Sequence, residues 1–133
     1  MSIAVDTSVL VAIAKGESEA SDWIELLIDA QTEDELILCD VVAAEFFALL
    51  LDEEKFRDTL NRLGIVFRET SLESAQFAGR IFREYRRHGG PREHLIPDFL
   101  IAAYAEKQAR GIAAIDRGYL RRYFPGLKIL KPD

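Results

Sequence analysis

Four acidic side chains stand beside apolar segments in widely separated parts of the chain. They are Asp6 after "SIAV", Glu45 within "VVAAEFFALLL", Asp98 within "LIPDFLIAAYA" and Asp116 after "IAAI". Two carboxylates about 4 Å apart repel each other by about 4 kcal/mol at an effective dielectric constant of about 20, so a cluster of them requires a cation. Ligation by oxygen alone, with neither His nor Cys, suits Mg²⁺ or Mn²⁺. If the fold brings the four acids together, they predict a divalent-metal site.

Ordinary structural roles compete with this interpretation. An Asp directly after a strand commonly caps the next helix, which applies to Asp6, to Asp116 and to Asp40 after "LILC". We assign Asp40 to that role alone. Asp98 follows Pro97, so in the first turn of a helix it would face the positive end of the helix dipole.

Glu45 is harder to explain by such a role, because it is the only charged side chain between Asp40 and Asp52. On a helix it shares a face with apolar neighbours, so we expect it to be partly buried. A buried carboxylate is costly unless it is paired, neutralised or bound to a cation. The alternative is a Glu at the helix rim that reaches water or an Arg.

Two hydroxyl groups, those of Thr7 and Ser8, directly follow Asp6. They are suited to orient a carboxylate or a metal-bound water. Their alternative role is to cap a helix.

Short apolar strands alternate with helical patterns along the chain. The predicted strands are "SIAVD", "ELILCD", "IVFRE", "IAAI" and "LKIL". One helical segment, "TSLESAQFAGRIFREYRRHGG", opens with a capping box from Thr70 to Glu73. The alternation favours right-handed crossovers and a sheet covered on both faces. We therefore predict an α/β fold with three α/β/α layers and a mainly parallel sheet of four to five strands, with ligands bound beyond the carboxyl ends of the strands.

Length and composition limit the class of protein. With 133 residues, 49% of them hydrophobic, the chain is expected to form a single domain over residues 1–133. No apolar run approaches the roughly 20 residues of a membrane span and no signal peptide is recognisable, so we expect a cytoplasmic protein with no membrane contact. The single cysteine, Cys39, excludes an internal disulfide and is expected in the core.

The net charge of −6 is distributed unevenly. Residues 1–66 carry 15 acidic and 4 basic side chains, a net charge of −11, whereas residues 67–133 carry 8 acidic and 13 basic ones, a net charge of +5. The acidic half suggests a surface for a basic partner. Within the basic half, "GRIFREYRRHGGPR" contains Arg80, Arg83, Arg86, Arg87 and Arg92, with Tyr85 and His88 between them. Arginines that hold phosphates and rings that stack on unpaired bases are typical of RNA binding, and a solvated helix face is the competing explanation.

The chain resembles the PIN-domain ribonucleases, especially the VapC-like toxins of bacterial and archaeal toxin-antitoxin pairs. The likeness rests on "VDTSVLVAIAKGE", "AEF" around Glu45, "YRRHGGPREHLIPDFLIAAYA" and "DRGYLRRYFPGLKIL", which span nearly the whole chain. Residue by residue, the resemblance implies that Asp6, Glu45, Asp98 and Asp116 form an acidic quartet, with Thr7 or Ser8 as the hydroxyl beside the first acid. One position departs from the pattern: Ala114 stands where many relatives carry a Thr, which puts a supporting hydrogen bond in doubt.

The resemblance implies an endoribonuclease that depends on Mg²⁺ or Mn²⁺, since such an ion lowers the pKa of a bound water and neutralises charge on the phosphoryl group. The candidates for holding RNA phosphates are Arg86, Arg87, Arg92 and Arg117. The resemblance also implies a homodimer and a VapB-like antitoxin whose C-terminal segment wraps the toxin. That partner predicts an apolar groove among the first helices, with Val9, Leu10, Val11, Trp23, Phe46 and Phe47 as candidate lining residues.

Three alternatives stay open. A haloacid-dehalogenase-like phosphohydrolase also has an Asp after its first strand, but it needs a second Asp where this chain has Ser8. A PIN-fold nuclease of RNA processing would share the chemistry without being a toxin. A non-catalytic module that only binds RNA or protein would be expected to lack one or more of the acids, and all four are present.

Overall fold

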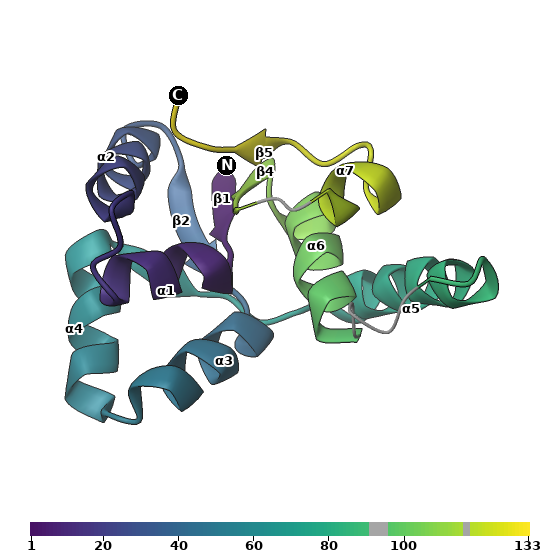
Figure 1. Cartoon of the computed structure of the whole chain (residues 1–133), viewed down its shortest axis with the longest axis horizontal. Coiled ribbons are helices and arrows are strands. Elements are labelled where there is room, and N and C mark those ends of the chain that lie inside the picture. Colours follow the sequence, from purple (N-terminus) through teal and green to yellow (C-terminus); the bar gives the residue numbers. More distant parts are fainter. Residues whose placement is uncertain (91–95, 116–117) are drawn as a thin grey trace.

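The computed structural model describes residues 1–90, 96–115 and 118–133 (Figure 1). The strands in these ranges are β1 (Ser2–Val5), β2 (Glu35–Leu38), β3 (Ile65–Phe67), β4 (Gly111–Ala113) and β5 (Ile129–Leu130). The helices are α1 (Thr7–Ala14), α2 (Ala20–Ala30), α3 (Asp40–Leu50), α4 (Glu53–Leu63), α5 (Leu72–Arg87), α6 (Ile96–Gln108) and α7 (Tyr119–Tyr123).

The five strands form one sheet in the order β3-β2-β1-β4-β5. Every pairing among these strands is parallel, where the sequence predicted a mainly parallel sheet. β1 lies at the centre and pairs Ile3 with Leu36 of β2 and with Gly111 of β4. Because strands inside a parallel sheet are covered on both faces, their residues are apolar throughout, as "IAV" and "LIL" are.

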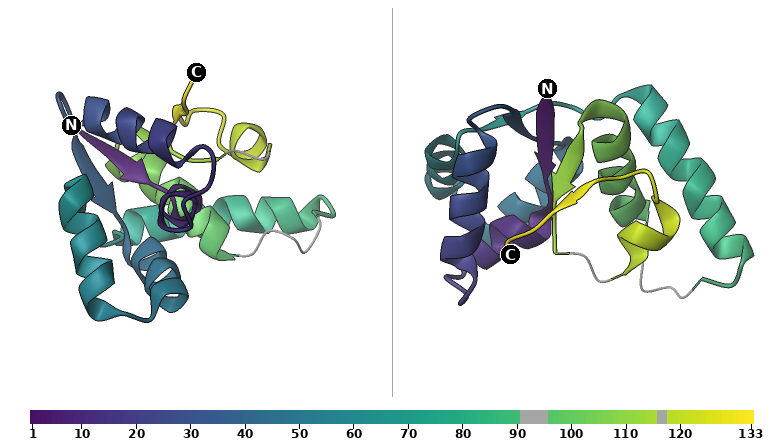
Figure 2. Two further views of the ribbon diagram at one scale, coloured as in Figure 1. Left: turned by 60° about the vertical axis from the view of Figure 1, so that its left-hand side comes forward. Right: turned by 90° about the horizontal axis from the view of Figure 1, so that it is seen from above.

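Helices cover both faces of the sheet, as expected for three α/β/α layers. α2 contacts β2 and α4 contacts β3, whereas α6 packs on β1 and β4 with α5 against it. Seen from above in Figure 2, α1, α2 and α4 lie on one side of β1 and α5 to α7 on the other. The predicted fold class is confirmed.

The segment after β2 forms two separate helices, α3 and α4. Leu51 ends α3 in the left-handed region, with φ of 49°, and Asp52 then caps α4 by accepting a hydrogen bond from the Lys55 N–H at 3.0 Å. Gly64 closes α4 with φ of 68°, a conformation that favours glycine at a helix C-cap.

Two predicted helix caps are wrong by one residue. α5 is capped by Ser71, which accepts from the Ser74 N–H at 3.1 Å, and α3 follows Cys39 at its N-cap position. Thr70 and Asp40, the predicted caps, instead bind each other: the Thr70 hydroxyl and N–H donate to Asp40 Oδ1 at 2.6 and 3.0 Å. These hydrogen bonds lower the pKa of Asp40 and join the start of α3 to the segment before α5.

The core contains most of the residues that were predicted to line an apolar groove. Val9, Leu10 and Phe46 are fully buried, so that prediction is wrong for these three, whereas Trp23 is 2% exposed and lines a hollow beside the end of β4. They are buried because α1, α2 and α3 turn these positions inward, and Phe47 remains the exposed member of the set. Cys39 is buried, as expected. None of the helices in the described ranges is long and apolar enough to cross a membrane.

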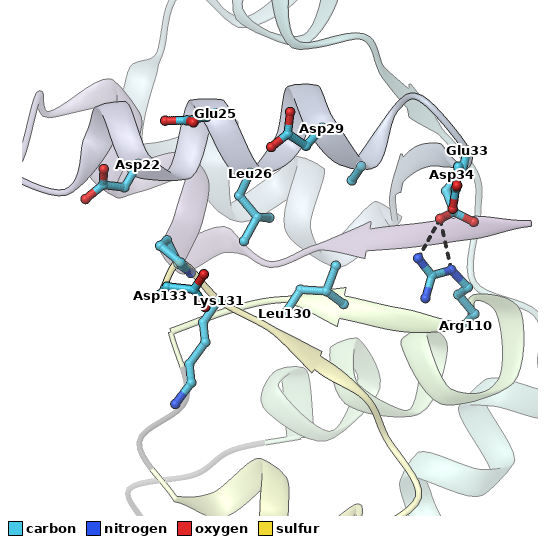
Figure 3. A pocket seen from close by; sticks show the side chains of 12 residues that line it. Asp22, Glu25, Leu26, Asp29, Glu33, Asp34, Arg110, Leu130, Lys131 and Asp133 are labelled. Carbon is cyan, nitrogen blue, oxygen red and sulfur yellow. Dashed lines mark hydrogen bonds and ion pairs between the residues drawn. The ribbon is translucent and has the colours of Figure 1, made fainter.

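An ion pair ties the amino-terminal side of the sheet together. Arg110, directly before β4, donates from Nε and Nη2 to Asp34 Oδ2 at 2.9 and 2.7 Å, and Asp34 directly precedes β2 (Figure 3). The Asp34 side chain is 4% exposed. The hydrogen bonds from Arg110 lower the pKa of Asp34, which makes its contribution to stability dependent on pH.

We expect Asp34→Asn to lower the midpoint of thermal unfolding at neutral pH and to have no effect in strong acid. The pKa of Asp34 in the folded protein lies below its unfolded value of about 3.9, so the ionised pair stabilises the fold above that value. This stability is lost as the pH falls through the lowered pKa. Thermal melts followed by circular dichroism across this pH range test the expectation. Asp29→Asn, a substitution of an exposed residue, is the control. If the difference in unfolding midpoint between wild type and variant stayed the same as the pH falls, the stabilising role of the ionised pair would be contradicted.

Candidate functional site

The candidate site lies where the order of the strands reverses. The chain leaves β1 toward β2 through α1 and α2, and returns to β4 on the other side of β1 only after α5 and α6. The carboxyl ends of β1 and β4 therefore leave a crevice between diverging connections, which is where parallel α/β sheets bind ligands. Asp6 follows β1 at this point, and its N–H donates to the Ala113 carbonyl of β4 at 3.0 Å.

Asp6 is held in place by the residue two positions on. Its Oδ2 accepts hydrogen bonds from the Ser8 hydroxyl at 2.5 Å and from the Ser8 N–H at 3.2 Å. Asp6 is thus the N-cap of α1, as one reading of the sequence proposed, and it also faces the crevice edge of the sheet. Burial raises the pKa of Asp6 above its usual value, and the Asp98 carboxylate raises it further, while the bonds from Ser8 oppose this rise.

Asp98 reaches the same edge of the sheet from the opposite layer. It lies in the first turn of α6, the helix that returns along β1 and β4, so it begins at their carboxyl ends. The next residue, Phe99, is fully buried against the rings of Tyr85, Phe82 and Phe124, which fixes the first turn of the helix. The tertiary fold therefore brings Asp98 into electrostatic contact with Asp6.

Glu45 joins this edge through α3, but it is exposed, so the expected partial burial is wrong. Val42 and Phe46 are the buried residues of α3, whereas Glu45, between them in the sequence, is exposed. Its Oε1 accepts a hydrogen bond from the Thr7 hydroxyl at 2.6 Å. Since Thr7 directly follows Asp6, this bond holds Glu45 beside the first acid.

Ser8 has a second contact that the sequence did not reveal. Its hydroxyl accepts a hydrogen bond from the Ile115 N–H at 3.2 Å while it donates to Asp6. Ala114, where the resemblance led us to expect a Thr, is 1% exposed and has no hydroxyl to offer. Ser8 therefore supplies a hydrogen bond between the first acid and the segment that leads to Asp116.

Asp116 itself, with Arg92 and Arg117, lies outside the described residues. Within the ranges that are described, no group of three His, Cys, Asp or Glu side chains is arranged to hold a metal ion. The donor set nevertheless fits a divalent cation in its chemistry, because it consists of carboxylate oxygens and two of them, on Asp6 and Asp98, repel each other. The completeness of the quartet stays a prediction.

The remaining predicted RNA-binding residues lie at the end of α5. Arg86 and Arg87 are exposed there, and the Arg86 guanidinium lies 5.9 Å from the ring centroid of Phe82. Tyr85 was expected to stack on a base, which is wrong, because it is 1% exposed and packs against Phe99.

His88, the other ring expected to stack on a base, is exposed directly after α5. Its Nδ1–H donates to the Glu84 carbonyl at 2.8 Å. The ring makes this hydrogen bond while it stays exposed to solvent.

We expect Asp6→Asn to stabilise the metal-free protein at neutral pH. The folded pKa of Asp6 is raised, so its charge destabilises the fold above the unfolded pKa of about 3.9, and this cost disappears in acid. Asn keeps an acceptor for the Ser8 N–H and removes the charge. Thermal melts with and without Mn²⁺ test it: the ion should raise the midpoint of the wild type and leave that of the variant nearly unchanged. Equal stabilisation of both proteins by Mn²⁺ would contradict a role of Asp6 in metal binding.

Comparison with known proteins identifies the fold. A family model described as PIN domain matches residues 3–124. No curated protein matches the chain.

Solved structures of several bacterial proteins match nearly the whole chain. VapBC2 from Rickettsia felis, bound to a DNA fragment from their promoter, has a TM-score of 0.75 at 18% identity, and the match covers 100% of both chains. VapBC-1 from nontypeable Haemophilus influenzae has a TM-score of 0.71 at 11% identity over 98% of each chain. Mycobacterium tuberculosis VapC20, described as a sarcin-ricin loop cleaving toxin, has a TM-score of 0.64 at 16% identity over 95% of this chain and 98% of that one. At these identities the matches establish the fold alone.

Proposed function

This chain belongs to the PIN domain family, and we propose that it is an endoribonuclease that depends on Mg²⁺ or Mn²⁺ and hydrolyses phosphodiester bonds of RNA. The observation that supports the proposal is that Asp6 follows β1 at the reversal point of the sheet and that Asp98, in the first turn of α6, raises the pKa of Asp6 electrostatically. The two residues come from opposite sides of the fold. Neither a packing role nor a capping role requires their charges to be close, whereas a shared cation does.

We propose that Asp6, Asp98 and Asp116 hold the ion, with Glu45 as a further ligand or as the group that positions water. A bound divalent cation supplies a Lewis acid that lowers the pKa of water and neutralises phosphoryl charge. Ser8 keeps the Asp6 carboxylate oriented through two hydrogen bonds. Because Thr7 engages Oε1 of Glu45, we propose that Oε2 accepts the proton of the attacking water.

RNA would approach along the basic side of the molecule. α5 extends away from the sheet in Figure 1, with Arg86 and Arg87 exposed in its last turn. Guanidinium groups hold phosphates through paired N–H donors, so we propose that these two residues bind the RNA backbone, a kind of contact that carries no sequence information. Arg92 and Arg117 are proposed for the same role.

We further propose that the protein is the toxin of a VapBC-type pair, acts as a homodimer in the cytoplasm and is inhibited by a VapB-like antitoxin. The match to VapBC structures over nearly the full chain length supports this reading. A nuclease of RNA processing and a non-catalytic PIN module are the alternatives. Growth arrest upon expression distinguishes a toxin from an RNA-processing enzyme. The dehalogenase-like alternative is dropped, because the chain matches the PIN domain family.

We expect Asp98→Asn to reduce cleavage of a structured RNA by about 100-fold or more, because removing one group that stabilises transition-state charge has this effect in other enzymes. Cleavage by the wild type should disappear with a chelator and return with Mg²⁺ or Mn²⁺. Gel analysis of labelled RNA measures both. Asp40→Asn is the matched control, since Asp40 lies at the same sheet edge but binds Thr70. Metal-independent cleavage that survives in Asp98→Asn would overturn the proposal.

We expect the double variant Arg86→Ala/Arg87→Ala to weaken RNA binding and to lower its dependence on salt. Each lost phosphate contact reduces the slope of log K against log salt by about 0.7 for single strands. Arg57→Ala/Arg62→Ala on α4 is the control, because both arginines pair with acids of their own helix. Filter binding at several salt concentrations measures the slopes. Equal losses in both double variants would mean that only net charge matters.

A further inference from the structure

A hollow of about 290 Å³, which we call the β4 hollow, lies at the carboxyl edge of the sheet. Its lining includes two residues that follow β4, two that follow β5 and one near the start of α2: Ala114, Ile115, Lys131, Pro132 and Asp22. Figure 3 shows Asp22 and Lys131 at one end of a larger neighbouring pocket that shares them. Because β1, β4 and β5 are parallel neighbours, their carboxyl ends lie at one edge. The β4 hollow therefore lies at the edge that carries the candidate active site.

Hydrogen bonds join the wall of the β4 hollow to the first acid of that site. The Ile115 N–H donates to the Ser8 hydroxyl at 3.2 Å, and this hydroxyl donates to Asp6 Oδ2 at 2.5 Å. The Asp6 N–H in turn donates to the carbonyl of Ala113, the last residue of β4, at 3.0 Å. A ligand in the hollow is thus held against the backbone to which Asp6 is bonded. In a nuclease, a group at this place belongs to a nucleotide beside the bond that is cleaved.

The lining of the hollow offers apolar surface and hydrogen-bond acceptors. Ile115 and Pro132 are half-buried and supply apolar surface on which a ring can pack. Glu19 and Asp22 border the same hollow with exposed carboxylates. An ionised carboxylate only accepts hydrogen bonds, so a ligand that pairs with these groups must present N–H or O–H donors.

Two basic side chains, Arg121 of α7 and Lys131 after β5, complete the character of the hollow, and both are exposed. Such groups attract the phosphates that flank a bound nucleotide, and a guanidinium plane can also stack on a base. A purely acidic hollow would favour a cation and a purely basic one a phosphate. Apolar surface, acceptors and basic groups together match a nucleotide, which has an apolar ring face, N–H donors and a charged backbone.

We propose that the β4 hollow binds the base of one nucleotide beside the scissile phosphate, and that this base is guanine. The Watson–Crick edge of guanine carries two adjacent donors, N1–H and the N2 amino group, so one carboxylate accepts from both. Adenine and cytosine place a ring acceptor beside their amino group, and a carboxylate repels that acceptor. Uracil has one N–H between two carbonyl groups. The inference deepens the proposed function, on which it rests for RNA as the ligand.

The hollow supplies a source of sequence preference that the arginines of α5 do not. Contacts of Arg86 and Arg87 with phosphates would hold any RNA in the same way, whereas acceptors that face a base edge distinguish one base from another. The expected consequence is cleavage next to an unpaired guanine.

Trp23 is the only tryptophan in the chain and lines the β4 hollow, so its fluorescence reports binding there. The probes are short uridine oligoribonucleotides that carry one central guanine, adenine or cytosine. They are titrated into the full-length protein in the presence of a chelator, which prevents cleavage. We expect the guanine probe to bind about tenfold more tightly than the other two, because a carboxylate that pairs with a base edge through two hydrogen bonds discriminates by about this factor.

Matched double variants remove two negative charges from the same region of the protein. Glu19→Gln/Asp22→Asn should reduce the preference for guanine to less than about twofold, because an amide carries a donor as well as an acceptor and therefore also pairs with adenine. Glu25→Gln/Asp29→Asn on α2 is the control, since both residues line the larger pocket and lie outside the β4 hollow. The control should keep the preference of the wild type. Circular dichroism checks that both variants are folded.

Three outcomes would overturn the inference: equal binding of the three probes by the wild type, a guanine preference that survives in Glu19→Gln/Asp22→Asn, or the same loss in the control. Cleavage with Mg²⁺ is a separate measurement, made on a longer RNA whose cut sites are mapped on a sequencing gel. Cuts should lie next to guanine in the wild type and at other nucleotides as well in Glu19→Gln/Asp22→Asn. A guanine preference in binding without any cleavage would support this inference and contradict the nuclease proposal, so the two failures are distinguishable.

Discussion

The central place of β1 is the constraint on which the rest of the structure depends. β1 is hydrogen-bonded to β2 along one edge and to β4 along the other, and helices cover both of its faces. Ile3, Ala4 and Val5 of this strand are buried, so a charged side chain finds room only beyond its end. The first such residue, Asp6, therefore stands at the rim of the sheet, where the backbone turns into α1. Thr7 and Ser8 are positioned by α1, which starts at this rim, and Asp98 by α6, which packs against β1.

The ionised form of Asp6 at the candidate site lowers the stability of the fold. Burial and the nearby Asp98 both disfavour the ionised form of Asp6, and the hydrogen bonds from Ser8 offset only part of that effect. A protein selected for stability alone would place an uncharged residue there. Residues that are unfavourable for folding and yet supported by specific hydrogen bonds are characteristic of functional sites, because binding of a ligand recovers the lost free energy.

The uneven charge along the sequence corresponds to an acidic and a basic surface on two different sides of the molecule. The acidic face of α2 and the basic end of α5 belong to opposite layers, with the sheet between them (Figure 2). The two charged surfaces therefore lie apart on the molecule. At the carboxyl edge of the sheet, Asp6, Ser8 and Ile115 are joined by hydrogen bonds.

The sequence by itself determined the elements and the ends at which the acids stand. Apolar runs bounded by polar residues predicted the five strands, and the pattern after Pro97 placed Asp98 in the first turn of a helix, because these signals act over a few neighbouring residues. The family motifs added the prediction that the four acids form one site.

Only the tertiary structure decided which helix faces are buried and which polar groups meet. Glu45 is exposed and Tyr85 is buried, contrary to expectation, because the partner that covers a helix face is not encoded in the helix itself. The bonds from Thr70 to Asp40 and from Ile115 to Ser8 link residues 30 and 107 positions apart, a separation over which no local pattern acts. Periodicity and caps are local properties of the chain, whereas pairing across the sheet exists only once the strands have assembled around β1.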